Sequence, residues 1–156
     1  MNLAPQSIRT FFVTFSTAGR RSLFQSEQFA TLLLSVFSDN RLKRRFELHE
    51  FVIMPDHVHL LITPAADVSL EKAVQYIKGG FSFRAKRELG SALEIWSASF
   101  NEHRVQDTED YSRNRAYIRA NPSKSGLGRQ YQYVSGNNSF KLDPAPDWVR
   151  RWETRG

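Results

Sequence analysis

The sequence predicts an α+β domain in which strands and helices follow one another in the order βαββαβ, with a further helix after the last strand. Three observations predict this class. Segments rich in β-branched and aromatic residues alternate with segments whose apolar residues recur at helical spacing. Only a Pro-Asp turn separates the two middle strands, so these strands form a hairpin. An antiparallel sheet with helices on one face is the ferredoxin-like plan, which is the fold that we expect.

The first half of the chain supplies three strands and one helix. Residues 9–16 are rich in β-forming side chains and end before Ala-Gly, which indicates a strand. Ser26 is a suitable N-cap for a helix with one apolar stripe, formed by Phe29, Leu32, Leu33, Val36 and Phe37. The apolar segments 46–54 and 57–63 form the two strands of the hairpin.

The second half supplies two helices and one strand. Ser69 is an N-cap for a helix whose inward side chains are Leu70, Val74, Ile77 and Phe81. We expect the glycines at 79–80 to interrupt this helix, each at a cost of about 1 kcal/mol relative to alanine. Either close packing or close approach of a nucleic-acid backbone would explain them. Residues 95–105 form a less regular fourth strand, and a last helix begins at Asp107 and ends at Asn121, before a proline.

The composition restricts the function classes. A chain of 156 residues is most simply one domain, and the lack of cysteine excludes disulfides and cysteine-ligated metal sites. No segment is apolar over the length that a membrane helix needs, and the N-terminus lacks a signal-peptide pattern, so we expect a cytoplasmic protein. The net charge of +6 favours a polyanionic partner such as nucleic acid, although it also serves solubility.

The most informative motif is a pair of histidines at the start of the second hairpin strand. His57 and His59 are two residues apart, and side chains two apart on a strand point to the same face. Two neighbouring imidazoles are costly to bury unless something holds the rings, and a divalent metal does this well. A structural pair of histidines is the alternative.

The last helix carries a second polar pair. Tyr117 and Asn121 are four residues apart and share one helical face, whereas Tyr111 and Ile118 lie on another face, which suits packing. Tyr111 is the rival of Tyr117 for any role as a nucleophile. We prefer Tyr117 because it shares its face with Asn121, but spacing does not show that the helix reaches the histidines.

Together these motifs resemble a known family. Residues 51–62, with one apolar residue between two histidines, resemble the HUH motif of single-strand DNA transposases that use one tyrosine. Residues 117–127 are similar to the tyrosine-helix signature of REP-associated tyrosine transposases, in which Asn-Pro follows four residues after the tyrosine and Gly-Leu ends the turn. The resemblance extends over residues 9–127.

The resemblance implies a ferredoxin-like catalytic domain over residues 1–127 and an aromatic and basic tail over 128–156. It implies that His57 and His59 bind a metal, with Asn121 as third ligand and Tyr117 as nucleophile. The implied activity is metal-dependent nicking and rejoining of single-stranded DNA through a 5′-phosphotyrosine, on repeats that form hairpins. Two imidazoles and one amide make Mn²⁺ a rival to Mg²⁺. The implied protein is a monomer or a homodimer.

Basic residues outside the motifs are candidates for DNA contact. We expect Lys78, Arg84, Arg44 and Arg45 to touch DNA, although the last two also suit a helix C-terminus. In the tail, aromatic residues interleaved with basic ones either stack on bases or pack on the domain. Asp56 and Glu50 are candidates to orient an imidazole.

Two other function classes compete with this enzyme. One is a single-stranded nucleic-acid-binding module without catalysis, in which Phe11, Phe12 and Phe15 would stand in for base-stacking aromatics, although core packing explains these residues better. The other is a metal-dependent hydrolase of the barrel type, and 156 residues are too few for that barrel.

Overall fold

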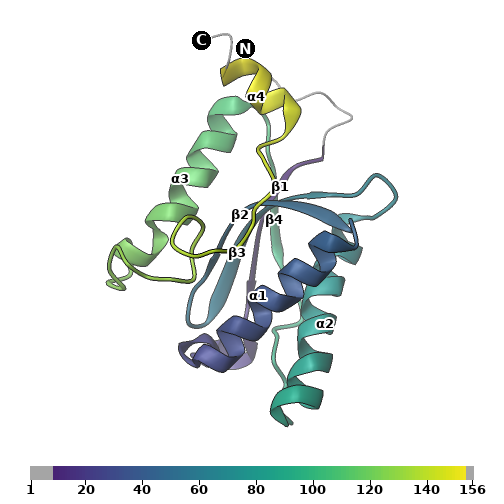
Figure 1. Cartoon of the computed structure of the whole chain (residues 1–156), viewed down its shortest axis with the longest axis vertical. Helices are drawn as coiled ribbons and strands as arrows, with labels where there is room; N and C mark the ends of the chain where they lie inside the picture. Colours follow the sequence, from purple (N-terminus) through teal and green to yellow (C-terminus); the bar gives the residue numbers. More distant parts are fainter. Residues whose placement is uncertain (1–8, 154–156) are drawn as a thin grey trace.

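A computed structural model of the chain describes residues 9–153, with side chains up to residue 151 (Figure 1). Its sheet has the strand order β2-β3-β1-β4, with every neighbouring pair antiparallel. This order, together with the helix between β1 and β2 and the helix between β3 and β4, confirms the ferredoxin-like prediction. The elements are β1 (Phe11–Ser16), short 3-10 turns η1 (Ala18–Arg20) and η2 (Leu23–Gln25), α1 (Glu27–Leu42), β2 (Phe46–Ile53), β3 (His57–Pro64), α2 (Leu70–Leu89), β4 (Asn101–Arg104), α3 (Thr108–Lys124) and α4 (Asp147–Glu153).

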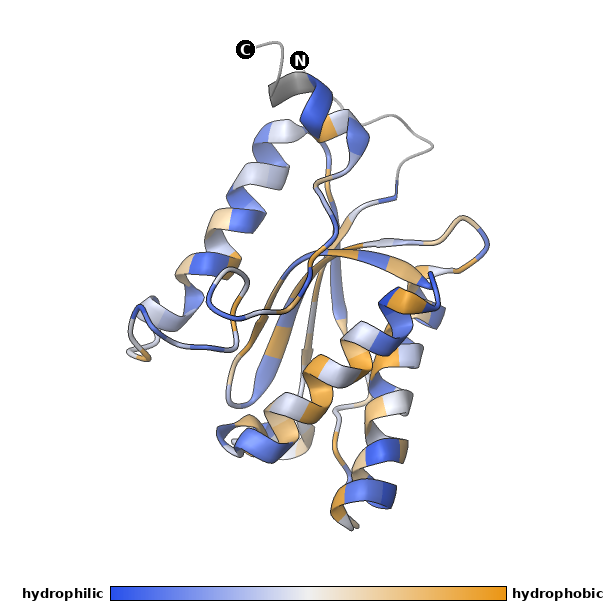
Figure 2. Cartoon of the chain, in the orientation of Figure 1, coloured by the Kyte–Doolittle hydropathy of each residue, from blue (hydrophilic) through white to orange (hydrophobic). Residues whose placement is uncertain are grey.

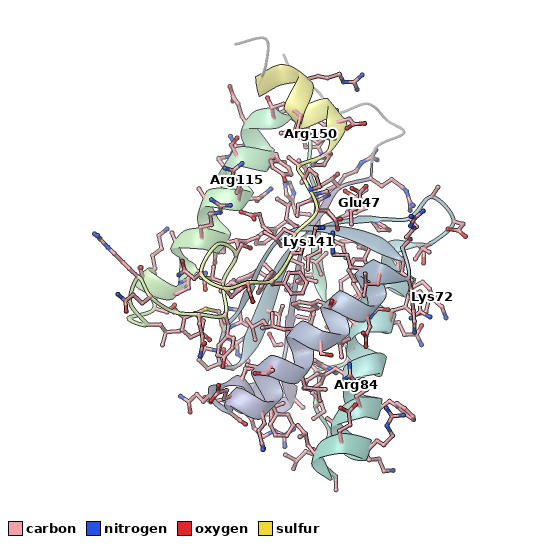
Figure 3. The ribbon with its side chains drawn as sticks, in the orientation of Figure 1. Glu47, Lys72, Arg84, Arg115, Lys141 and Arg150 are labelled. Carbon is pink, nitrogen blue, oxygen red and sulfur yellow. The ribbon has the colours of Figure 1, made fainter. Side chains whose placement is uncertain are left out.

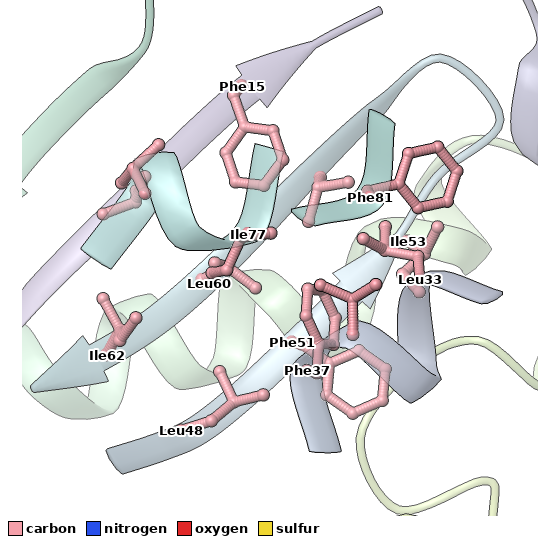
Figure 4. Close-up of a cluster of buried hydrophobic side chains, with 14 of the residues drawn as sticks. Phe15, Leu33, Phe37, Leu48, Phe51, Ile53, Leu60, Ile62, Ile77 and Phe81 are labelled. Carbon is pink, nitrogen blue, oxygen red and sulfur yellow. The ribbon is translucent and has the colours of Figure 1, made fainter. Parts of the chain in front are cut away.

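Helices α1 and α2 cover one face of the sheet and enclose the larger core (Figure 1). Apolar residues of both helices face the sheet, while hydrophilic residues cover most of their outer sides, with Leu42 and Phe83 as exposed exceptions (Figure 2). The core is built largely from phenylalanine and branched aliphatic side chains, among them Leu33, Phe37, Phe51, Leu60 and Phe81 (Figure 4). The interruption expected at Gly79 and Gly80 is wrong, because α2 is helical through both glycines.

Helix α3 covers the opposite face of the sheet, together with α4 (Figure 1). A second, smaller core lies there, formed by Val52, Met54, Leu61, Val105, Tyr111, Ile118, Val134, Trp148 and Val149. The central strand β3 therefore has buried side chains on both faces, while β1 contributes the partly buried Phe12 to the smaller core. Among the described residues, no helix is long and apolar enough to cross a membrane.

A β-bulge in β2 changes which residues face α3. Leu48 pairs with Ile62 and Glu50 pairs with Leu61, so two steps along β2 correspond to one step along β3. The extra residue is His49. As a result His49 and Glu50 both avoid the larger core, and Leu48 and Phe51 on either side of them both belong to it.

Two predicted boundaries differ from the structure. Helix α3 continues through Pro122 to Lys124, because the carbonyl of Pro122 accepts from the main-chain N–H of Ser125 and of Leu127 and so closes a last turn. The fourth strand is shorter than residues 95–105. Ile95 and Trp96 turn into the larger core, where the indole N–H of Trp96 donates to the carbonyl of Lys78 at 3.0 Å.

The tail lies along the free edge of β2. Main-chain hydrogen bonds join Tyr133, Ser135 and Asp143 to this strand, at 2.8, 3.0 and 2.9 Å. Of the two alternatives for the tail aromatics, packing on the domain is therefore the one that holds for the described side chains. Four of them contact the two cores, namely Tyr131, Tyr133, Phe140 and Trp148. Trp152 was part of the same prediction, and its side chain lies outside the described part.

Candidate active site between β3 and α3

The two histidines lie side by side on the face that α3 covers. His57 pairs with Ser16 and His59 pairs with Thr14 across β3 and β1, and the ring centroids of the two histidines are 4.8 Å apart. The alternation of β3 sends Val58 between them into the larger core. The prediction that His57 and His59 point to the same face of the strand is therefore confirmed.

Each imidazole is held at its Nδ1 atom by a different neighbour. Nδ1 of His57 lies 2.7 Å from Oδ1 of Asp56, and Nδ1 of His59 lies 2.8 Å from Oγ1 of Thr14. An imidazole that donates from Nδ1 carries its lone pair on Nε2, where it can bind a metal. Nε2 of His59 is buried and has no hydrogen-bond partner. Asp56 thus has the contact required to orient an imidazole, and Thr14 has the same role although the sequence reasoning did not single it out.

Burial keeps His59 uncharged. It lowers the pKa of His59 to about 4, and the charges of His57 and Arg20 act in the same direction. At neutral pH the ring is therefore in the neutral form that coordinates metals. A buried acceptor without a partner is costly, so the site gains most from a ligand that binds at Nε2.

Helix α3 brings Tyr117 against this pair. The ring centroids of Tyr117 and His59 are 5.3 Å apart, and Phe12 of β1 lies beside both rings. Tyr117 is 44% exposed, so a strand arriving from solvent can reach its hydroxyl. Tyr111 is only 2% exposed and packs against Trp148, which leaves it no route to a substrate.

Asn121 follows one helical turn after Tyr117. Its side chain is buried and its Oδ1 atom has no hydrogen-bond partner. Facing elements therefore present a free imidazole nitrogen and a free amide oxygen, a donor set that suits Mn²⁺ or Mg²⁺. The described side chains contain no cluster of three or more His, Cys, Asp or Glu that could hold a metal. The amide oxygen of Asn121, which has no partner, is a candidate for a third ligand beside the two histidines.

An ion pair anchors α3 to the sheet. Glu50 of β2 is buried, and its Oε1 lies 2.5 Å from Nε of Arg119 and 3.8 Å from Nε of Arg115. These two arginines flank Tyr117 in sequence. From the sequence, Glu50 is a candidate to orient an imidazole. Its partners are instead the arginines of α3, so it fixes the helix that carries Tyr117. A glutamate inside an otherwise apolar strand segment is the feature of the sequence that indicates a basic partner for a buried carboxylate.

The predicted DNA contacts lie apart from this site. Arg84 bonds Ser35, Asp39 and Glu88 and so bridges α1 and α2 (Figure 3). Lys78 donates to the carbonyl of Ser97 at 2.8 Å.

Two further predicted contacts, Arg44 and Arg45, precede β2, whereas the histidines follow it. The eight residues of β2 span about 25 Å, so these arginines lie at the other end of the sheet. The guanidinium of Arg45 also stacks on Tyr76, 3.9 Å from the ring centroid.

Comparison with known proteins decides the family. The sequence model of the family described as "Transposase IS200 like" matches residues 9–121, which include the histidine pair, Tyr117 and Asn121. The chain belongs to the family of IS200-like transposases. It is 30% identical over 122 residues to the REP-associated tyrosine transposase of Escherichia coli strain K12, covering 78% of this chain and 70% of that protein.

Solved structures agree with this assignment. The structure of a REP-associated tyrosine transposase bound to a REP hairpin superposes with a TM-score of 0.67 at 29% identity, over 82% of this chain and 76% of that one. A protein from Deinococcus radiodurans with 19% identity and a TM-score of 0.50 shares the fold, over 71% of this chain and 88% of its own. The resemblance expected from the motifs is confirmed, and as a transposase-family member this chain is a DNA-processing enzyme.

Proposed function

We propose that this enzyme nicks and rejoins single-stranded DNA, with Tyr117 as the nucleophile. The observation that carries the proposal is the contact between the ring of Tyr117 and that of His59, whose buried Nε2 atom has no partner within the described structure. A half-exposed phenol beside two neighbouring imidazoles, one of which has a free nitrogen, suits phosphoryl transfer to tyrosine.

The proposed metal ligands are His57, His59 and Asn121. The free Nε2 of His59 and Oδ1 of Asn121 fit a divalent cation, and three protein ligands leave positions open for phosphate oxygens and water. When bound, Mg²⁺ or Mn²⁺ would neutralise charge on the scissile phosphate and stabilise the departing oxygen. Asp56 and Thr14 hold the two rings so that their Nε2 atoms stay available.

The proposed reaction conserves the phosphodiester bond. The oxygen of Tyr117 forms a bond to phosphorus while the bond from phosphorus to the 3′-oxygen breaks, which gives a 5′-phosphotyrosine and a free 3′-hydroxyl. A 3′-hydroxyl of a second strand then attacks the same phosphorus and releases the phenol, so rejoining requires no ATP. One chain carries every group named, so neither step requires a residue of a second copy.

The proposed substrate is single-stranded DNA next to a hairpin. The net charge of +6 suits a nucleic acid, and the solved relative is bound to a REP hairpin. Duplex DNA should be a poor substrate, because the phenol must approach an unstacked phosphate.

A binding module without catalysis is less well supported. Such modules stack bases on an open face of the sheet. Here α1 and α2 cover one face, and α3 covers the other with an apolar core of its own. Phe15 is buried in the larger core, and Phe12 packs against the rings of both His59 and Tyr117.

Covalent trapping tests the proposal. The protein is incubated with labelled single-stranded hairpin oligonucleotides and either Mn²⁺ or Mg²⁺, and a denaturing gel separates any adduct. We expect an adduct with the wild-type protein, none with Tyr117→Phe, and none after chelation of the metal. The matched control, Tyr111→Phe, should retain the adduct because Tyr111 is buried. An adduct that survives Tyr117→Phe, or its absence from the wild type with every hairpin tested, would contradict the proposal.

A further inference from the structure

The turn after β1 holds an arginine in a strained backbone conformation. Gly19 has a φ of 63° and Arg20 a φ of 56°, so two consecutive residues are left-handed. Glycine adopts this conformation without steric cost, whereas a residue with a Cβ does not. Among the described residues, Arg44 is the only other non-glycine residue with a positive φ. A strained residue persists where its surroundings enforce the conformation, and such residues cluster at functional sites.

Hydrogen bonds fix this turn beside the histidine pair. The main-chain N–H of Thr17 donates to the carbonyl of Asp56 at 3.0 Å, which ties the turn to the β2–β3 hairpin. Nη1 of Arg20 donates to Oγ of Ser16 at 2.9 Å, and Ser16 is the residue that pairs with His57. The guanidinium therefore lies on the face of the sheet that carries the two histidines.

A shared carboxylate connects this arginine to a proposed metal ligand. Oδ2 of Asp56 lies 3.2 Å from Nε of Arg20, while Oδ1 of the same residue lies 2.7 Å from Nδ1 of His57. One carboxylate thus separates the guanidinium from the imidazole. It holds both groups in place before any substrate is bound.

The guanidinium still has hydrogen-bond donors to offer. The Arg20 side chain is 61% exposed, and its Nη2 atom has no partner within residues 9–153. A guanidinium presents its N–H groups in a planar fork that matches two phosphate oxygens. A rigidly placed, exposed cation next to a site for one phosphate can bind the next phosphate of the same strand.

We propose that Arg20 binds a backbone phosphate adjacent to the scissile one and so directs the scissile linkage toward Tyr117. This inference rests on the proposed function, since it requires a DNA strand at the histidine pair. The ligand class is a phosphodiester of single-stranded DNA. Asp56 acts as a positioning residue for both Arg20 and His57.

The test measures binding without chemistry. Tyr117→Phe protein, with and without Arg20→Gln, is titrated into a labelled hairpin oligonucleotide with a single-stranded flank in the presence of Mn²⁺. Each flank phosphate is replaced in turn by an uncharged methylphosphonate. We expect Arg20→Gln to weaken binding about tenfold and to reduce the salt dependence by almost one counterion. One methylphosphonate position should weaken the parent to a similar extent and have no further effect on the Arg20→Gln protein, because direct partners are not additive.

Two control variants separate binding from folding. Arg87→Gln removes the same charge from α2, on the other side of the sheet, where the side chain is 64% exposed, and should change binding much less. Arg20→Gly removes the side chain together with its strain. It should leave the midpoint of urea unfolding unchanged or raise it, as Arg44→Gly should also do, while binding weakens as in Arg20→Gln.

The outcomes distinguish this inference from the proposed function. If the parent binds the oligonucleotide but no methylphosphonate position couples to Arg20, the inference is wrong, even where wild-type protein forms the adduct. Coupling without any wild-type adduct would support the Arg20 contact and remove the nicking function. If Arg20→Gly lowers the unfolding midpoint, and binding weakens only in variants whose midpoint is lowered, the role of Arg20 is structural and the inference fails.

Discussion

The two faces of the β-sheet bury different kinds of side chain, although the same strands supply both. Under α1 and α2, β3 contributes three fully buried apolar residues, Val58, Leu60 and Ile62. Under α3, the same strand contributes His57, His59 and Leu61, and β2 adds the buried polar residues His49 and Glu50. One face is thus an ordinary apolar core, and the other mixes a small core with groups that need partners.

This difference divides stability and chemistry between the faces. Burial of apolar surface stabilises the fold by about 25 cal/mol per Å², without requiring a defined geometry. A buried polar group is costly unless it is hydrogen-bonded. The α3 face contains buried acceptors without partners in His59 and Asn121, a cost that the apolar face has to offset. We therefore expect substitutions on the two faces to have different consequences.

The largest expected difference is between two adjacent residues of β3. Leu60→Ala should lower the free energy of unfolding by about 2 to 5 kcal/mol, because it leaves a cavity in the larger core. His59→Ala should lower it by about 1 kcal/mol or less, since it removes one hydrogen bond and also an unpartnered buried atom. Urea unfolding measures both. Adduct formation per folded molecule should show the reverse order, with His59→Ala inactive. Equal losses of stability would contradict the division between faces.

The anchor of α3 should give an intermediate effect. Glu50→Gln removes the charge that faces Arg119 and Arg115 and should lower the free energy of unfolding by about 2 kcal/mol. It should also slow adduct formation, because the helix that carries Tyr117 is held less firmly. The control is Glu47→Gln on the same strand, where the side chain is exposed and the change should be small (Figure 3). Unchanged adduct kinetics in folded Glu50→Gln protein would show that the ion pair does not position the helix.

The α3 face should also make the stability of the protein depend on pH. Burial lowers the pKa of His49 to about 4, against the opposing effects of the Pro144 carbonyl and the charge of Asp143. Between pH 4 and about 6.5 the unfolded chain binds a proton that the folded chain does not. The contribution of neutral His49 to the free energy of unfolding is therefore fully present above pH 6.5. It is lost on acidification, by at most about 1.4 kcal/mol per pH unit. His59, whose pKa is also about 4, adds a second contribution of the same sign.

Urea unfolding of metal-free protein at pH 7.5 and pH 5 measures this dependence. His49→Gln should retain hydrogen bonds to Thr63 and Pro144 while it removes one of the two titrating groups. The loss of stability between the two pH values should then be clearly smaller than in the wild type. An unchanged loss would mean that His49 does not become protonated when the protein unfolds.

The sequence predicted the parts of the fold that depend on local patterns. The strand and helix order followed from periodicity, and the side-chain ladder of the hairpin placed His57 and His59 on one face. The short β4 could not be predicted, because its four residues are all exposed and their pairing with β1 depends on a neighbour that is distant in sequence. The same holds for the tail, which meets β2 through isolated main-chain bonds without any period.

The sequence singled out the candidate residues of the site and, among the residues that support them, Asp56. Motif spacing singled out the histidines, Tyr117 and Asn121, whereas the contact of α3 with β3 needed the three-dimensional structure. Thr14 and Arg20 carry no motif, since a threonine in a strand and an arginine in a turn are ordinary. Their importance arises from register and from backbone conformation, which spacing along the chain does not report.

The extra residue in β2 reverses the parity of the strand. Before His49 the even-numbered positions face α1 and α2, and after Glu50 the odd-numbered positions do. A deletion of either residue would restore a regular strand and at the same time remove one of the two polar groups from the α3 side. The irregularity therefore lets an otherwise alternating segment place two consecutive polar residues beneath one helix, and the anchoring of that helix depends on it.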